Sequence, residues 1–276
     1  MVKINCLTEN SALRGSHFWG EHGLSFLIDT GQEVLLFDTG QTAPVLLHNL
    51  ALLGRSLAEI DALALSHAHN DHTGGLPVVL SQRPGLPVYA NPDIGRPRYS
   101  RKAGRFRFIG SPLSVEAMAR LADLRLNAVP AEIVAGVWTT GEIVARPEPE
   151  GRGDSHVVPA GEGWQPDPYQ DDMSLVVETP RGLVLVCGCC HAGLLNTLAH
   201  VSQAFQRPII AVLGGTHLVS ARGTALDRVV GVLAEQYGPL RLYPNHCSGE
   251  RAFVALVTAF GDRVQPCPAG MTLTFD

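Results

Sequence analysis

The stretch Ser66-His67-Ala68-His69-Asn70-Asp71-His72-Thr73-Gly74-Gly75 decides both the fold and the chemistry of this chain. It follows a short apolar run, residues 62–65, which we expect to be a buried strand. Four side chains of the kinds that bind metals stand within six of its residues: His67, His69, Asp71 and His72. Chance rarely places so many ligand types directly after a buried strand, which argues against a merely polar loop.

The spacing of these four side chains divides them between two ions. Residues two apart on an extended chain point the same way, so His67 and His69 can bind one ion. Asp71 and His72 lie on the turn into a helix expected over residues 71–82, and they can address a second ion nearby. Imidazole together with carboxylate suits Zn²⁺, with Fe or Mn²⁺ as alternatives. The stretch therefore predicts two divalent metal ions, zinc in the first place.

Composition narrows the class of protein. The 276 residues carry a net charge of −5, with 17% charged and 45% hydrophobic residues. Such a chain is too apolar for disorder, and its acidic balance argues against a general nucleic-acid binder. No apolar run approaches the roughly 20 residues of a membrane span, and the first residues lack the core of a signal peptide. We expect a cytoplasmic protein without a membrane partner, whose 6 cysteines stay thiols.

Strands and helices are expected in a similar order in both halves of the chain. The first half has a strand pair, a helix and the strand before the histidine stretch: residues 24–28, 34–37, 43–53 and 62–65. The second half has a strand pair, alternating helices and strands, and a final strand: residues 174–178, 183–186, 194–205, 209–213, 226–237, 240–243, 252–260 and 271–275. Two mixed β-sheets with helices outside would bury these elements as a four-layered αββα sandwich, an α/β fold.

A single domain is expected over residues 1–276, because no separating linker is visible. Residues 84–172 have an insert-like character, first basic and then rich in Pro and Gly. Within them, residues 112–127 have the apolar spacing of an amphipathic helix, and residues 146–172 have the composition of a long loop.

The basic part of this region has no acidic residue between Arg96 and Arg107. Its cations are Arg96, Arg98, Arg101, Lys102, Arg105 and Arg107. Aromatic side chains alternate with them, so the segment could bind a phosphate or stack on a planar ring, and a solvated basic face is the alternative. Six cations gathered in a chain of net charge −5 would steer an anionic substrate to this place.

The histidine stretch also resembles the His-x-His-x-Asp-His signature of the metallo-β-lactamase superfamily of metal-dependent hydrolases. Residues 36–40, Leu-Phe-Asp-Thr-Gly, are similar to that family's early strand-end motif. Residues 188–193, 214–218 and 246–249 resemble a narrower branch named after an archaeal 7,8-dihydropterin-6-methyl-4-(β-D-ribofuranosyl)aminobenzene-5′-phosphate synthase. The resemblance extends over nearly the whole chain.

The resemblance implies further site residues. His191 would join His67 and His69 on one ion, and His246 would join the ion of Asp71 and His72. His217 also follows an expected strand, and it could be a ligand, a proton donor, a substrate contact or a support. Asp38 would orient a ligand histidine, or it would simply cap its turn. Of the other histidines, His48 and His200 lie in expected helices, where surface or core packing is the default role. His17 and His22 lie in a Gly-rich loop that could form the wall of a pocket, and His156 has no specific expected role.

One departure from the family pattern concerns the carboxylate that usually bridges the two ions. Its counterpart is absent here, and Asp172, Cys189 or Cys190 could replace it. A site that binds one ion tightly and the other weakly is the alternative. Small buried core residues are the alternative role for these cysteines and for the neighbouring Cys187.

These observations together predict a metal-dependent hydrolase acting on a small anionic metabolite, phosphorylated or pterin-like. Asp71 would hold the proton of the attacking water, and His217 is the second candidate for direct chemistry. An RNA or DNA phosphodiesterase is an alternative that the basic segment supports and the acidic remainder of the chain opposes. A non-catalytic metal or thiol sensor is a further alternative. The sequence does not specify an oligomeric state.

Overall fold

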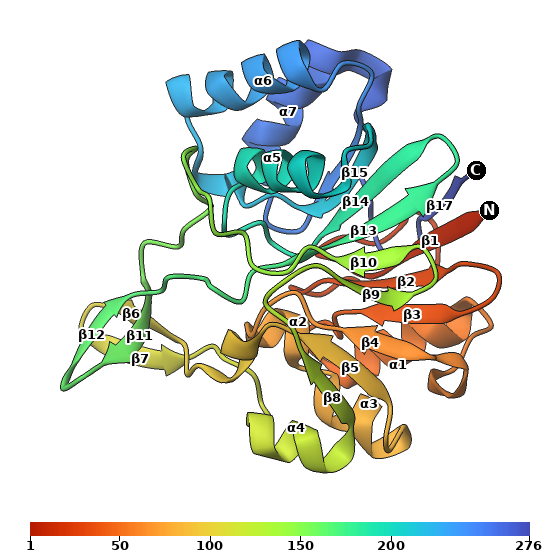
Figure 1. The fold of residues 1–276 in the computed structure, drawn as a ribbon, viewed down its shortest axis with the longest axis vertical. Helices are drawn as coiled ribbons and strands as arrows, with labels where there is room; N and C mark the ends of the chain where they lie inside the picture. Colours follow the sequence, from red (N-terminus) through yellow and green to blue (C-terminus); the bar gives the residue numbers. More distant parts are fainter.

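The structure, a computed structural model, describes all residues from 1 to 276 and is built on two large β-sheets packed face to face (Figure 1). The first sheet has the strand order β17 (Thr272–Phe275), β1 (Val2–Thr8), β2 (Ser25–Asp29), β3 (Val34–Phe37), β4 (Ala62–Ala64), β5 (Pro87–Ala90) and β8 (Asp123–Leu126). Strands β3, β4, β5 and β8 run parallel to one another, and the other pairings are antiparallel.

The second sheet is mixed in the same way. Its order is β16 (Arg241–Asn245), β15 (Ile209–Gly215), β14 (Gly182–Cys187), β13 (Ser174–Thr179), β10 (Val137–Thr139) and β9 (Ala131–Val134). Strands β14, β15 and β16 are parallel, whereas β13, β10 and β9 pair antiparallel. Each sheet therefore has a run of parallel strands, and the carboxyl ends of a parallel run meet at one edge.

Helices cover the outer face of each sheet. The first sheet is covered by α1 (Ala43–Leu52), α3 (Leu76–Gln82) and α4 (Val115–Leu121), and the second by α5 (Leu194–Phe205), α6 (Thr224–Gln236) and α7 (Glu250–Phe260). The one-turn helix α2 (Asn70–Thr73) lies at the edge of the first sheet, after β4. Short 3₁₀ turns complete the chain: η1 (Leu57–Glu59), η2 (Pro92–Gly95), η3 (Leu218–Ser220) and η4 (Gly261–Arg263). No helix combines the length and the apolar character that a membrane crossing would require.

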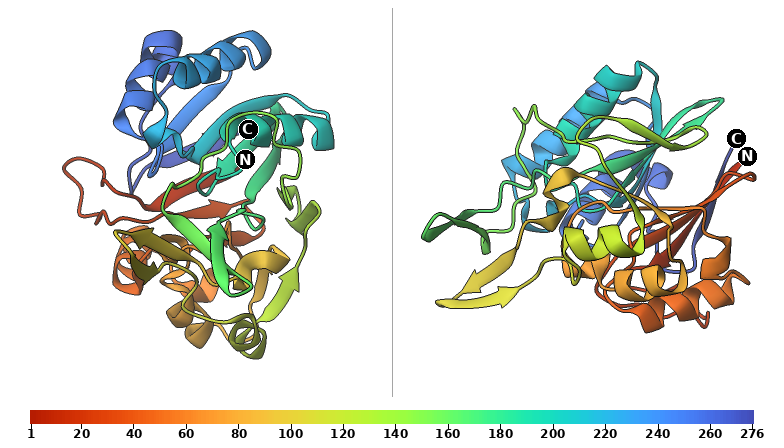
Figure 2. Two further views of the ribbon diagram at one scale, coloured as in Figure 1. Left: turned by 90° about the vertical axis from the view of Figure 1, so that its left-hand side faces the viewer. Right: turned by 60° about the horizontal axis from the view of Figure 1, so that its bottom comes forward.

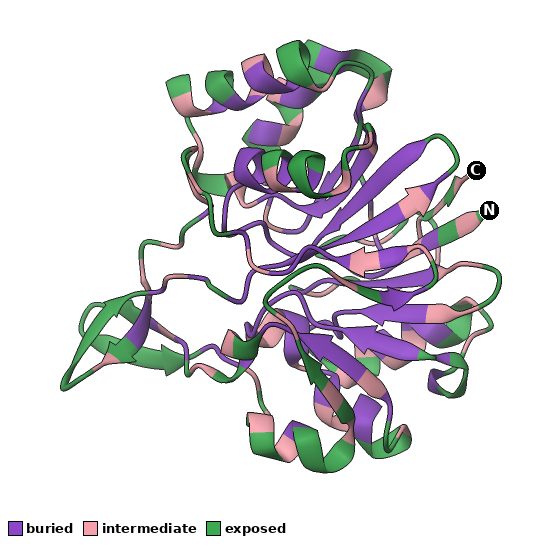
Figure 3. Cartoon of the chain, viewed as in Figure 1, coloured by how far each residue is buried: buried purple, intermediate pink, exposed green.

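Three apolar clusters fill the three interfaces between these layers (Figure 3). Strand β3 shows how the sequence builds them, because successive side chains point to opposite faces. Leu35 and Phe37 lie in the cluster between the two sheets, whereas Leu36 lies in the cluster under the helices of the first sheet. The predicted four-layered αββα sandwich is confirmed.

A third, smaller sheet was not expected. It has the antiparallel order β12 (Gly163–Pro166), β11 (His156–Ala160), β6 (Tyr99–Lys102) and β7 (Arg105–Phe108), and we call it the arm. The arm projects from the body of the molecule and is largely exposed (Figures 2 and 3). Its aromatic side chains pack on one another, as in the stacked pair of Phe106 and Trp164 with ring centroids 4.3 Å apart.

The prediction of a long loop over residues 146–172 was therefore wrong in part, because β11 and β12 form a hairpin there. The prediction of one helix over residues 112–127 also needs correction. Helix α4 ends at Leu121, and β8 follows at once, pairing parallel to β5 with Leu124 opposite Val88. Pairing with β5 overrides the helical spacing of the apolar residues. The helix expected over residues 71–82 is divided at Gly74 and Gly75 into α2 and α3.

Candidate metal centre

The polar residues singled out in the sequence gather where parallel strands of the two sheets end. Asp38 follows β3, the histidine stretch follows β4, Cys189 and His191 follow β14, His217 follows β15 and His246 follows β16. Three of them stand in the left-handed backbone region, with φ of 58° at Asp38, 46° at His217 and 51° at His246. Non-glycine residues adopt this region rarely, and such turns cluster at functional sites.

The four ligand-type side chains of the histidine stretch are divided over two neighbouring places. His67 Nε2 lies 3.0 Å from His69 Nδ1, which forms the first place. In the second place, His246 Nε2 lies 3.4 Å from Asp71 Oδ2 and 3.3 Å from His72 Nε2. His191 lies at the first place, with its ring centroid 4.9 Å from that of His67. The two halves of the chain thus contribute side chains to both places.

A buried hydrogen-bonded chain orients two of these imidazoles. His72 Nδ1 donates to Asp38 Oδ2 at 2.7 Å, and Ser66 Oγ donates to the same oxygen at 2.7 Å. His67 Nδ1 lies 2.8 Å from Ser66 Oγ. One carboxylate therefore directs Nε2 of both His67 and His72 toward the site, which is how metal-binding histidines are usually held. Sequence reasoning found Asp38 but missed Ser66.

The two histidines of the second half are held in the same way. His191 Nδ1 donates to the carbonyl of Gly151 at 2.7 Å, which leaves Nε2 as the free nitrogen. His246 Nδ1 lies 3.2 Å from Asn10 Oδ1, and its backbone N–H donates to Glu9 Oε1 at 2.8 Å. Glu9 and Asn10 follow β1 and carried no sequence signal, because nothing in that loop has ligand spacing.

The pKa values favour ligand chemistry. Burial, with the neighbouring histidines, lowers the pKa of His67 and His191 well below the ordinary value, so both are neutral imidazoles. Burial would raise the pKa of Asp71, but His72, His22 and His246 lower it well below its ordinary value. At His72, the charges of Asp38 and Asp71 outweigh burial and raise the pKa to about 9, so an ion would have to displace a proton there.

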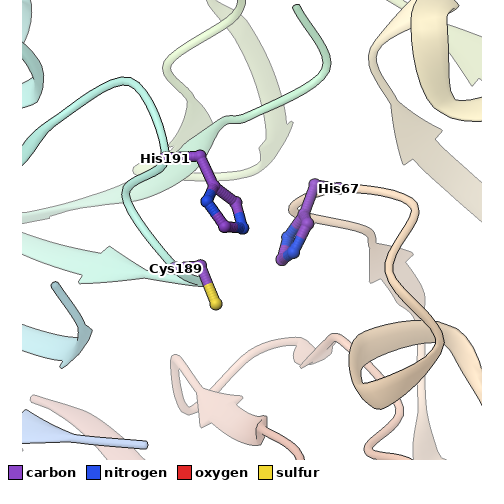
Figure 4. A group of neighbouring side chains, drawn as sticks. All are labelled: His67, Cys189 and His191. Carbon is purple, nitrogen blue, oxygen red and sulfur yellow. The ribbon is translucent and has the colours of Figure 1, made fainter. Parts of the chain in front are cut away.

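Two buried nitrogen atoms without a hydrogen-bond partner show that this donor set suits a metal. His191 Nε2 is buried and has no hydrogen-bond partner, and the same is true of His69 Nε2. Three groups have ligand atoms within 4.8 Å of one another. Two are buried, His67 with Cys189 and His191, and His72 with Cys189 and His246, and the third joins the more exposed His22 to Asp71 and His246. Figure 4 shows the first group, whose side chains point toward one common space. Nitrogen, sulfur and carboxylate donors of this kind fit divalent transition ions.

A pocket of about 290 Å³ opens over the two groups. Its lining includes His22, from the Gly-rich loop predicted as a candidate pocket wall, and Cys247 beside His246. It also includes His156, which sequence reasoning did not place at the site. His22 Nε2 lies 3.3 Å from Asp71 Oδ2, and His156 Nδ1 lies 2.8 Å from the hydroxyl of Tyr169. The signal that could have found His156 is residue type alone, because it stands by itself in its segment.

His217 lies between this pocket and a second one of about 260 Å³, which is lined among others by Arg152 and Arg228. Its ring centroid is 4.4 Å from that of His191, and its Nδ1 is buried without a partner. Burial, together with His156 and His246, lowers the pKa of His217 to about 4. The ring is therefore neutral at pH 7.

The three candidates for the missing bridging carboxylate are in different surroundings. Asp172 Oδ2 accepts a hydrogen bond from the backbone N–H of Ala192 at 2.8 Å and so supports the turn of His191. Cys190 belongs to the apolar cluster between the second sheet and its helices, together with Cys187. Cys189 lines the pocket, with Sγ 3.2 Å from His72 Nε2.

The six cations of the basic segment are also divided. Arg101, Lys102, Arg105 and Arg107 are exposed on the arm, and of these only Arg107 lines the metal pocket. Lys102, Arg105 and Arg107 surround an adjoining hollow on the arm. Arg96 pairs with Asp93.

Arg98 was predicted to contact the substrate, but the structure buries it among carboxylates. Its side chain is 0% exposed, and it lies within 3.0 Å of carboxylate oxygens of Asp93, Asp167 and Asp171. A guanidinium so enclosed has no surface left for a substrate. The basic pattern of the segment did not reveal this, because Asp93 lies just before the segment and the other two partners, Asp167 and Asp171, come from a stretch about 70 residues further along the chain.

Comparison with known proteins identifies the class of protein to which this fold and this site belong. The family model of the metallo-beta-lactamase superfamily matches residues 19–190, and the chain belongs to that superfamily. This fold implies binding of divalent metals, and the histidine groups described above are its candidate ligands.

Similar proteins extend over nearly the whole chain. A 7,8-dihydropterin-6-methyl-4-(beta-D-ribofuranosyl)-aminobenzene-5'-phosphate synthase of Methanocaldococcus jannaschii is 28% identical, over 99% of this chain and 97% of its own. An uncharacterized protein of the same organism is 31% identical over 93% of both chains. The crystal structure of Tm1679, described as a metal-dependent hydrolase of the beta-lactamase superfamily, has a TM-score of 0.86, with 27% identity and full coverage of both chains. The resemblance drawn from the motifs is confirmed.

Proposed function

We propose that this protein is a metal-dependent hydrolase with two divalent ions, zinc in the first place, acting on a small anionic metabolite. The observation that carries the proposal is the pair of buried ligand groups under one pocket, with His191 Nε2 left without a partner. A buried polar atom without a partner costs about 1–3 kcal/mol, so its retention calls for a ligand outside the chain.

The residues divide between the two ions as follows. His67, His69 and His191 would hold one ion, and Asp71, His72 and His246 the other. When bound, such ions lower the pKa of water and stabilise negative charge that develops on the oxygen under attack.

The chain's own residues would then position substrate and proton. Asp71 has a side chain 14% exposed toward the pocket, so its second oxygen can hold a proton of the attacking water. His217 is neutral and lies at the junction of the two pockets, where it can exchange hydrogen bonds with a substrate. We assign it to substrate contact rather than to acid catalysis, because its pKa of about 4 leaves it without a proton to give at pH 7.

An anionic substrate is supported by the arm. Arg107 lines the metal pocket and also the hollow that Lys102 and Arg105 surround. A phosphate or carboxylate there would lie next to the metal groups. The synthase relative is named for a phosphorylated pterin compound, which agrees with an anionic, pterin-like ligand.

The same relative favours one second candidate, a synthase that joins two groups instead of transferring one to water. Both activities can use one site, and they differ in whether water or a second substrate enters the pocket. The two are distinguished by the products formed with and without an arylamine acceptor.

The test begins with metal content. The purified protein is loaded with zinc, its bound ions are counted, and it is screened against phosphomonoesters, phosphodiesters including RNA, and lactones. We expect about two ions per chain and turnover of a small ester. His69→Ala should keep the fold, lose metal and lower turnover by about 10³-fold or more, since the ions supply several kcal/mol.

The matched control is His48→Ala, because His48 stacks on Trp19 away from the pocket. This variant should retain metal and activity. Unchanged turnover in metal-free His69→Ala would refute the hydrolase. Turnover restricted to RNA would support the phosphodiesterase instead, and full metal binding without any turnover would favour a sensor.

A further inference from the structure

We propose that the thiolate of Cys189 bridges the two metal ions, in the place where relatives of this fold use a carboxylate. The inference rests on the two-ion centre proposed above and adds a ligand to it. Three residues compete for this place, Asp172, Cys189 and Cys190, and their positions in the structure separate them.

Cys189 is the single residue shared by the two buried ligand groups. Its Sγ lies within 4.8 Å of the ligand nitrogens of His67 and His191, and equally of those of His72 and His246. Two donors at about 2.0–2.3 Å from one tetrahedral ion are roughly 3.5 Å apart, so each group needs only a small contraction to enclose an ion. A side chain common to both groups stands between the two ions.

The two competitors are engaged elsewhere. Asp172 Oδ2 is held at 2.8 Å by the backbone N–H of Ala192. Cys190 stands at φ 54° and is buried among apolar side chains of α5 and β14. Their positions are fixed by backbone hydrogen bonding and by core packing, so neither can turn to the pocket without disrupting its surroundings.

The turn that carries Cys189 is locked against the histidine stretch. A Cβ on Gly188 would collide with the hydroxyl of Ser66, so only glycine allows these two strand ends to approach so closely. Ser66 also contacts His67 Nδ1. Cys189 and His67 are therefore held on turns in direct contact, and the place of the sulfur relative to the imidazole is set by the backbone.

A bridging thiolate has a consequence for metal choice. Thiolate is a soft ligand that favours zinc and cobalt over manganese or magnesium. Bound metal would also shield the sulfur from alkylation, because the lone pairs that attack the reagent would be engaged.

The test uses cobalt as a spectroscopic probe in the full-length protein. A thiolate bound to Co²⁺ gives a near-ultraviolet charge-transfer band, which carboxylate and imidazole do not give. We expect the band in the wild type loaded with two cobalt ions. Cys189→Asp should still bind two ions but lose the band, and Cys189→Ala should bind both ions more than about tenfold more weakly, whereas loss of a thiolate bound to a single ion would weaken the binding of only that one.

Cys190→Ala is the matched control, because it removes a neighbouring thiol that faces the core, and its band should be unchanged. Circular dichroism and thermal melting identify any variant that fails to fold. If Cys189→Asp or Cys189→Ala does not fold, Cys189→Ser is measured in its place. A band that persists in Cys189→Asp, or that is absent from the wild type holding two cobalt ions, would overturn the proposal. These readouts do not need turnover, so a wild type with the band but without hydrolysis would refute the proposed function and leave the bridge standing.

Discussion

Two buried polar clusters lie side by side in the interior of the molecule, and they differ in whether their charges are paired within the chain. In the first, which we call the Arg98 cluster, the guanidinium of Arg98 lies 2.6 Å from Asp171, 3.0 Å from Asp167 and 3.0 Å from Asp93. In the second, the metal pocket, imidazole nitrogens point inward without a partner, as His191 Nε2 does while its Nδ1 donates to the carbonyl of Gly151. Opposite charges satisfy each other, whereas convergent lone pairs require an ion from outside.

The two clusters are also joined. Asp171 uses one oxygen for Arg98 and accepts with the other from the backbone N–H of Ala68 at 2.7 Å. Ala68 stands between His67 and His69, so the Arg98 cluster fixes the backbone that carries two candidate ligands. One cluster is thus a support and the other is the site that it supports.

The largest effect on stability is expected from breaking the Arg98 cluster. Arg98→Met leaves buried carboxylates without their cation and should lower the free energy of unfolding by about 3–5 kcal/mol. The exposed Arg101→Met should change it by less than about 0.5 kcal/mol. Urea denaturation of the metal-free protein measures both, and equal stability of the two variants would contradict the assignment.

A smaller effect is expected from the carboxylate that orients the metal pocket. Asp38→Asn keeps the size of the side chain but weakens its hold on His72 Nδ1 and Ser66, and it should reduce metal affinity about 10- to 100-fold. Competition with a chelator measures the affinity. Asp123→Asn, at an exposed ion pair with Arg125, should leave it unchanged, and unchanged affinity in Asp38→Asn would remove the orienting role.

The free energy of unfolding should depend on pH through His217, a buried imidazole whose Nδ1 has no partner, unlike Arg98, which is paired with carboxylates. His217 has a pKa of about 4 in the folded chain against an ordinary 6.5, so its share of the stability is present above pH 6.5 and lost as pH falls toward 4. Between pH 6.5 and 5, the metal-free wild type should lose about 1.5 kcal/mol more than His217→Gln. Denaturation of both at the two pH values tests this, and parallel losses would count against a buried neutral His217.

The smallest effect concerns the exposed edge of the pocket. Arg107→Gln should raise KM for an anionic substrate about two- to fivefold without changing kcat, since an exposed charge contributes no more than about 1 kcal/mol. A neutral lactone should show no such change. Arg101→Gln, on the arm but outside the pocket, is the control, and an equal rise in KM for both variants would indicate general attraction by the arm.

Local patterns predicted the parts of the molecule that neighbouring residues control. The candidate ligands from His67 to His72 could be read directly from the sequence, because four donor side chains lie within six residues after a strand. The αββα layers followed from short continuous apolar runs, such as residues 34–37 and 183–186, and from the similar order of strands and helices in the two halves. The arm escaped prediction, because β11 pairs with β6, which lies far away in the chain, and short exposed strands carry little apolar signal.

The sequence by itself determined the superfamily, the first candidate ligands and the four-layered fold, since strand ends and the spacing of donor side chains are local properties. Only the tertiary structure decided how the remaining candidates divide. Cys189 and Cys190 are adjacent and chemically identical, yet one faces the pocket and the other the core, because the turn after β14 directs them to opposite sides. Arg98 has the same residue type and spacing as its exposed neighbours, and only the approach of Asp167 and Asp171 from later in the chain encloses it. A side chain's direction and its partners depend on contacts between segments far apart in the chain, and these exist only once the sheets have packed.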